Sequence, residues 1–127
     1  MKEKKKAYMI CPVRGVSDEE KIFLDRYVKD LESKGYQVHY PPRDVNQNDS
    51  DGINIMLSHR EAMKKSDEAH IYWNGKSQGS YVDFGMFFMM KYFNRRLKLV
   101  LANKIERTPH KSFENVLLDL ESQTSSL

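Results

Sequence analysis

Ala7-Tyr-Met-Ile-Cys11 is an almost wholly apolar run that Pro12 brings to an end. A strand covered by helices on both faces has this composition, because neither side of it meets solvent. Ser17-Asp-Glu-Glu20 follows and predicts the start of a helix, since a serine three residues before a glutamate forms a capping box. A buried strand leading into a capped helix is the first half of a β-α-β unit.

The rest of the chain continues this alternation of short apolar runs and amphipathic stretches. Further strands are predicted at 37–40, 69–73 and 97–102, and further helices at 53–66, 80–94 and 113–120, with a polar loop at 43–52. Strands joined by helices favour a parallel sheet with right-handed crossovers. We therefore predict an α/β fold with a short parallel sheet of four or five strands. The predicted single domain spans 7–121, between a flexible basic arm (1–6) and a frayed tail (122–127).

Composition narrows the functional classes. With 39% hydrophobic and 31% charged residues the 127-residue chain resembles an ordinary globular domain. Much of the net charge of +3 comes from Lys2-Glu-Lys-Lys-Lys6, which indicates a solvated arm, so nucleic-acid binding is not expected. No apolar stretch is long enough for a bilayer span, and 7–11 is too short for a signal peptide. The lone Cys11 excludes an internal disulfide and fits a cytoplasmic location, and the four histidines show no metal-ligand spacing.

Ser77-Gln-Gly-Ser-Tyr-Val-Asp-Phe-Gly85 is the strongest local motif. It predicts an anion site, because free N–H groups at a helix start bind phosphate and the Ser77 and Ser80 hydroxyls can donate to it. Gly79 permits close approach of the ligand. A purely local interpretation stays open, in which Ser80 is the helix N-cap and Asp83 completes a capping pair.

Other candidate residues lie in the loops that follow the predicted strands, where ligands bind in parallel sheets. Arg14, in Cys11-Pro12-Val-Arg14-Gly15, can meet a phosphate or remain a solvated turn residue. The polar loop offers contacts to a base or sugar from Arg43, Asp44, Asn46 and Gln47, or is only a loop, and Asn74 opens the loop before Ser77. His59 falls on the apolar face of its helix, where a core role competes with one beside the sugar.

Taken together, these segments resemble the nucleoside 2-deoxyribosyltransferase superfamily, which includes 2′-deoxynucleoside 5′-phosphate N-hydrolases and cytidylate N-glycosidases. The motif residues are Ser77, Gly79, Asp83, Phe84 and Gly85, and the similarity extends to 8–15 and 40–44. The resemblance implies a flavodoxin-like three-layer sandwich, a homodimer and no cofactor. It also implies that Asp83 attacks the anomeric carbon, that Tyr8 lies beside it, and that Ser77, Gly79 and Arg14 hold a 5′-phosphate.

The resemblance thus predicts an N-glycosidic-bond hydrolase or transferase acting on a nucleoside or its 5′-monophosphate. Catalysis is assigned to Asp83, His59 and Tyr8, with the dipole of the first helical turn keeping Asp83 ionised. Substrate binding is assigned to residues from all four loops: Cys11, Pro12, Arg14, Gly15, Arg43, Asp44, Gln47, Asn74, Ser77, Gly79 and Ser80.

Two positions depart from the family pattern. Asp83 stands where a glutamate is usual, and His59 where the preceding helix usually carries an acid. Two alternatives therefore stay open, a non-catalytic nucleotide-binding module and a flavodoxin-like redox or protein-interaction domain. The helix at 80–94 is apolar almost all round, including Met86, Phe87, Met89 and Met90, which predicts burial of part of it in a dimer.

Overall fold

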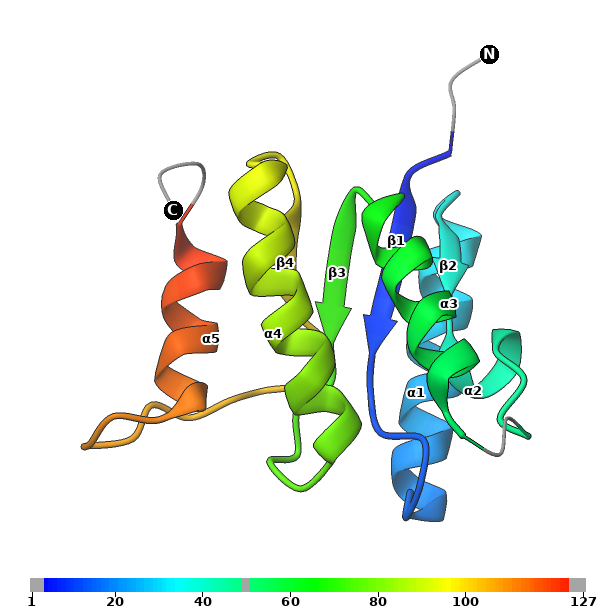
Figure 1. Ribbon diagram of the computed structural model, residues 1–127. Coiled ribbons are helices and arrows are strands. Elements are labelled where there is room, and N and C mark those ends of the chain that lie inside the picture. Colours follow the sequence, from blue (N-terminus) through cyan, green and yellow to red (C-terminus); the bar gives the residue numbers. More distant parts are fainter. Residues whose placement is uncertain (1–3, 49–50, 124–127) are drawn as a thin grey trace.

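The computed structural model describes residues 4–48 and 51–123 and forms a parallel sheet with helices on both faces (Figure 1). The elements are β1 (Lys6–Ile10), α1 (Asp18–Ser33), β2 (Gln37–His39), α2 (Pro41–Asp44), α3 (Ile53–Lys64), β3 (Glu68–Ile71), α4 (Gln78–Phe93), β4 (Lys98–Leu101) and α5 (Phe113–Ser122). The strand order is β2-β1-β3-β4, and all neighbours are parallel. The predicted α/β class, with four strands, is confirmed.

The order of the strands reverses beside β1. The chain passes from β1 to β2 on one side and then to β3 on the other, so the strand order reverses between β1 and β3. Ligands bind at such switch points in open parallel sheets. The loops after β1 and β3, which carry Arg14 and Ser77, both lie at this end of the sheet.

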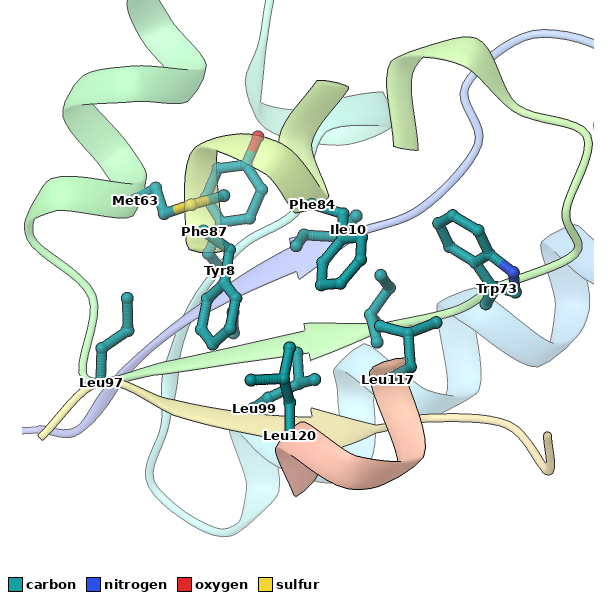
Figure 2. Close-up of a cluster of buried hydrophobic side chains, with 12 residues drawn as sticks. Tyr8, Ile10, Met63, Trp73, Phe84, Phe87, Leu97, Leu99, Leu117 and Leu120 are labelled. Carbon is teal, nitrogen blue, oxygen red and sulfur yellow. The ribbon is translucent and has the colours of Figure 1, made fainter. Parts of the chain in front are cut away.

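Alternation along the strands builds two cores. On one face, Tyr8 and Ile10 pack against α3, α4 and α5, and Figure 2 shows this cluster with Phe84 and Phe87 of α4. On the other face, Ala7 and Met9 pack with Leu24, Val28 and Leu31 of α1. This arrangement is a three-layer sandwich, because successive strand residues point to opposite faces and both faces are covered.

The capping predictions were right for α1 and wrong for α4. At α1, Ser17 Oγ accepts from the Glu20 N–H at 3.1 Å, and Glu20 Oε1 accepts from the Ser17 N–H at 3.2 Å. At α4 the N-cap is Ser77, whose Oγ accepts from the Ser80 N–H at 3.2 Å. The helix therefore begins at Gln78, and Asp83 lies in its second turn. The prediction that the dipole of the first turn acts on Asp83 is wrong, since that effect fades beyond the first turn.

A short helix replaces the beginning of the predicted polar loop. α2 covers Pro41–Asp44, and the Tyr40 N–H donates to Asp44 Oδ2 at 2.8 Å. Proline at the first helical position has the required φ and needs no amide partner, so the Pro-Pro pair that ends β2 also begins α2. Parts of three predicted segments lie outside the described residues: 1–3 of the arm, 49–50 of the loop and 124–127 of the tail.

One outer edge of the sheet is closed by α5, which lies beside β4 in Figure 1. The Leu101 N–H, which faces away from β3, donates to Glu121 Oε2 at 2.6 Å. An edge N–H that would otherwise face solvent thus has a charged acceptor. Across the described ranges, no helix is long and apolar enough to cross a membrane.

Candidate functional site

Tyr8, His59 and Asp83, from three different elements, meet beneath α4. The Tyr8 hydroxyl donates to Asp83 Oδ2 at 2.8 Å, and His59 Nδ1 lies 3.2 Å from Asp83 Oδ1. All three side chains are almost completely buried, with Asp83 4% exposed and Tyr8 fully enclosed. The structure therefore brings together the three residues to which catalysis was assigned.

Local sequence explains why these side chains converge. Ser80, Asp83, Phe84 and Phe87 recur at three- and four-residue spacing, which places them on the buried face of α4. Tyr8 shares the α4 side of β1 with Ile10, and Figure 2 shows its hydroxyl oxygen beside the α4 ribbon. His59 and Met63 are one turn apart on the buried side of α3.

The cluster has unused hydrogen-bonding capacity. Among the described residues, the buried side-chain atoms without a partner are His39 Nε2, His59 Nε2 and Ser80 Oγ. The His39 ring, at the end of β2, stacks on Tyr8 with centroids 5.2 Å apart. Buried polar atoms are nearly always paired, so these three unpaired atoms are candidates for ligand contacts.

Burial controls protonation around Asp83. The pKa of Tyr8 is raised well above its usual range, first by burial and then by the negative charge of Asp83, so the phenol stays a proton donor. Burial also raises the pKa of Cys11 to about 12, with Asp83 as the second cause, which leaves the thiol unreactive. The pKa of His39 is lowered by burial, against the pull of Asp44, so this ring is neutral at physiological pH.

The start of α4 holds the predicted phosphate-binding residues Ser77, Gly79 and Ser80. Gly79 has no positive φ, and a Cβ there would make only an ordinary contact with Ser77 Oγ at 3.9 Å. The fold itself therefore does not require glycine at this position. An approaching ligand remains a physical reason for the missing side chain.

The loop after β1 forms one wall of a separate hollow of about 490 Å³. Pro12 and Gly15 line it together with Arg43 of α2, whereas Asp83 is not among its lining residues. Gly15 has a φ of 65°, a conformation that favours glycine. Arg14 is exposed on this loop.

The remaining predicted binding residues have partners within the chain. Arg43 donates to Asp44, to Glu32 Oε1 at 3.1 Å and to the Val38 carbonyl at 3.1 Å. The Gln47 amide donates to the Pro41 and Val45 carbonyls, both at 3.2 Å. These contacts fix α2 and the segment after it.

Asn74 also has partners on both of its amide groups. Its Nδ2 donates to Glu20 Oε2 at 3.1 Å, and its Oδ1 accepts from the Lys76 N–H at 2.8 Å. Asn74 thus connects the loop after β3 to the first turn of α1. It aligns the two loops that meet at the switch point.

A second buried polar cluster, on the α1 face, was not predicted from the sequence. His70 Nε2 lies 2.8 Å from Glu68 Oε1, His70 Nδ1 lies 2.6 Å from the Tyr27 hydroxyl, and the Tyr36 hydroxyl donates to Glu68 Oε2 at 3.2 Å. The alternation Glu68-Ala-His70 was the available signal, because residues two apart on a strand share a face. His39 was missed for a similar reason, since only its pairing with Tyr8 across β1 and β2 reveals its place.

Comparison with known proteins supports the fold. The sequence matches no protein-family model and no characterised protein. The structure is similar to that of Clostridium botulinum CMP N-glycosidase, BcmB, with a TM-score of 0.58 and 15% sequence identity, over 91% of this chain and 82% of that one. This likeness confirms a flavodoxin-like α/β fold and supports the resemblance at the level of fold.

Proposed function

We propose that this protein cleaves or transfers the N-glycosidic bond of a nucleoside or a nucleoside 5′-monophosphate. The observation that carries the proposal is the buried Tyr8–Asp83–His59 cluster, which hydrogen bonds hold together. A carboxylate beside the anomeric carbon can stabilise or capture the oxocarbenium-like state through which such bonds break. One solved structure with a similar fold is described as a CMP N-glycosidase, which agrees with this choice of chemistry.

The substrate's phosphate is proposed to bind at the start of α4. Gly79 leaves room for it, and the buried Ser80 hydroxyl has no partner among the described residues. Arg14, exposed on the neighbouring loop, supplies a guanidinium that can close over the phosphate. Pro12 and Gly15 shape that loop, while Arg43, Asp44, Gln47 and Asn74 hold the loops in position. Because Asp83 is buried, the substrate must displace side chains to reach it.

The test is release of free base from a panel of ribo- and deoxyribonucleosides and their 5′-monophosphates, followed by chromatography. Wild-type protein should release base from at least one substrate. Asp83→Asn should abolish release, whereas Glu68→Gln, which alters the buried carboxylate of the other cluster, should retain it. If the folded wild-type protein releases no base from any member of the panel, the proposal fails.

A second candidate function is nucleotide binding without turnover. Two observations favour it: the shorter acid at position 83, and the hydrogen bonds that occupy both carboxylate oxygens. An acid displaced by about 1 Å from its productive position costs on the order of 100-fold in rate. Calorimetric binding of a nucleoside monophosphate with no base released over hours would select this function.

We further propose that the protein is a homodimer in the cytoplasm, with α4 at the interface. Phe87 is in the core, but Phe88, Met89, Tyr92 and Phe93 are exposed, the last of them 79%. An exposed apolar patch of this kind is typical of an interface between protein chains. Light scattering should give twice the chain mass. Phe88→Glu should give the monomer mass, while Ile22→Glu, an equally exposed change on α1, should not; a wild-type monomer would contradict the proposal.

A further inference from the structure

Each carboxylate oxygen of Asp83 has a hydrogen-bonding partner within the chain. Oδ2 accepts from the Tyr8 hydroxyl and Oδ1 faces His59 Nδ1, so these two contacts fix the position of the carboxylate, and its movement toward a sugar would stretch or break them. Breaking either would leave a buried donor unpaired, because Tyr8 and His59 are enclosed in the core. The side chain is therefore held as an acceptor between two donors.

The contact with Asp83 determines which nitrogen of His59 carries a proton. An ionised carboxylate can only accept, so the Nδ1 atom, 3.2 Å from Oδ1, is the nitrogen that carries the proton when the ring is neutral. The lone pair is then on Nε2. This atom is buried and has no partner within the described part of the chain. A carboxylate that fixes an imidazole with its second nitrogen bare prepares that nitrogen to accept a proton.

We propose that His59 Nε2 is the proton acceptor for an attacking water, and that Asp83 is a positioning residue that holds the imidazole. This inference rests on the proposed function and assigns the reaction at the same site. The water oxygen bonds to the anomeric carbon and gives its proton to Nε2. The base leaves with the electron pair of the carbon–nitrogen bond and takes a proton from solvent, and the imidazolium then returns its proton to solvent.

The proposed step has a stereochemical consequence. Water attacks from the side opposite the leaving base, so the configuration at the anomeric carbon inverts in a single displacement. A carboxylate nucleophile would instead give two displacements and overall retention. The shorter aspartate agrees with a single displacement, because a residue that orients His59 needs no reach to the sugar.

The tautomer of His59 can be measured without any substrate. Long-range ¹H–¹⁵N correlation spectra at pH 7.5 should show Nδ1 protonated and Nε2 bare for His59, assigned with His59→Gln. Asp83→Ala should shift His59 toward the opposite tautomer. His70 is the internal control, since Glu68 should keep its Nε2 protonated in both proteins. A protonated His59 Nε2 in the wild-type protein overturns the inference.

Turnover then tests the reaction itself. Proton spectra taken before the sugar anomers equilibrate should show the inverted product, and His59→Gln should lower kcat by about 100-fold or more with little change in KM. Asp83→Glu should restore part of the rate lost in Asp83→Ala only if it restores the wild-type tautomer. Retained configuration, or a sugar covalently attached to Asp83, overturns this inference and leaves the proposed function intact. Absence of cleavage on every substrate overturns the proposed function and this step together.

Discussion

Each face of the sheet carries a buried histidine and a buried carboxylate that are hydrogen-bonded to tyrosine, but the two clusters differ in how many of their polar atoms are paired. On the α1 face, His70 has a partner at both ring nitrogens and both oxygens of Glu68 are occupied. On the α4 face, both oxygens of Asp83 also have a partner, yet His59 Nε2 and Ser80 Oγ are unpaired among the described residues. Tyr27 and Tyr36 are only half-buried, whereas Tyr8 is fully enclosed, and the unused hydrogen-bonding capacity lies in the more deeply buried cluster around Asp83.

The two histidines also differ in the nitrogen that faces the acid. Glu68 meets His70 at Nε2 and Tyr27 occupies the other nitrogen, which closes that cluster. Asp83 meets His59 at Nδ1, and Nε2 has no partner in the part of the chain that the structure describes. The comparison indicates that a buried polar cluster points to function when one of its donors or acceptors has no partner. A cluster whose polar atoms are paired within the chain is explained by its contribution to the fold.

The largest expected difference between the two clusters is the loss of activity when the carboxylate of each is converted to its amide. Asp83→Asn should lower kcat/KM by about 1,000-fold or more, because the amide no longer fixes the His59 tautomer. Glu68→Gln should change kcat/KM by less than about threefold, as it contacts no substrate. Steady-state kinetics on a nucleotide that the wild-type protein cleaves measures both. Equal losses of kcat/KM in Asp83→Asn and Glu68→Gln would contradict the functional difference between the two clusters.

The saturated cluster should matter mainly to folding. Glu68→Ala leaves the Tyr36 hydroxyl and the His70 N–H without acceptors, so the free energy of unfolding should fall by about 3 kcal/mol. Urea denaturation followed by circular dichroism measures the loss. Asp119→Ala, which removes only the exposed ion pair with Arg107, is the control and should cost less than about 1 kcal/mol. A loss in Glu68→Ala no larger than in the control would contradict the structural role.

Acid should weaken the α1-face cluster. Burial lowers the pKa of His70, against the opposing effect of Glu68, so the unfolded chain binds more protons than the native state as pH falls. This contribution to stability is present above the unfolded pKa of about 6.5 and is lost below it, by up to about 1.4 kcal/mol per pH unit. Urea midpoints between pH 5 and 8 should show this slope. The slope of the urea midpoint against pH should be shallower in His70→Gln and unchanged in His110→Gln. A slope in His70→Gln equal to that of the wild-type protein would contradict this prediction.

Removal of a single hydroxyl from each cluster should give the smallest difference in stability between them. Tyr36→Phe deletes the 3.2 Å bond to Glu68 and should lower the free energy of unfolding by about 1 kcal/mol. Ser80→Ala deletes an oxygen that has no partner within the described residues, so stability should stay within about 0.5 kcal/mol. Thermal and urea unfolding of the two variants give the difference. Destabilisation by Ser80→Ala would show that its hydroxyl is already satisfied in the free protein.

Local patterns predicted most of the fold from the sequence. The apolar run at 7–11 identified a doubly covered strand, and Ser17 with Glu20 identified the start of α1, because each signal lies within a few residues of what it specifies. The start of α4 was placed two residues late because Ser77 and Ser80 both offer a cap. Only the structure shows that Ser77 Oγ accepts the Ser80 N–H.

Only part of the site was predicted from the sequence, because its residues are far apart along the chain. Tyr8 and Asp83 are 75 residues apart, and their pairing was expected from family resemblance and not from spacing. The burial of Asp83, the second cluster and the stacking of His39 on Tyr8 depend on strand register across the sheet. Register is set by contacts between distant segments, which local patterns do not specify.

The contact between Glu121 and the Leu101 amide has a consequence for polymerisation. An incoming strand at this edge would have to expel the carboxylate and bring its own carbonyl oxygens close to a negative charge. Amyloid-like stacking through β4 is therefore disfavoured by both hydrogen bonding and electrostatics.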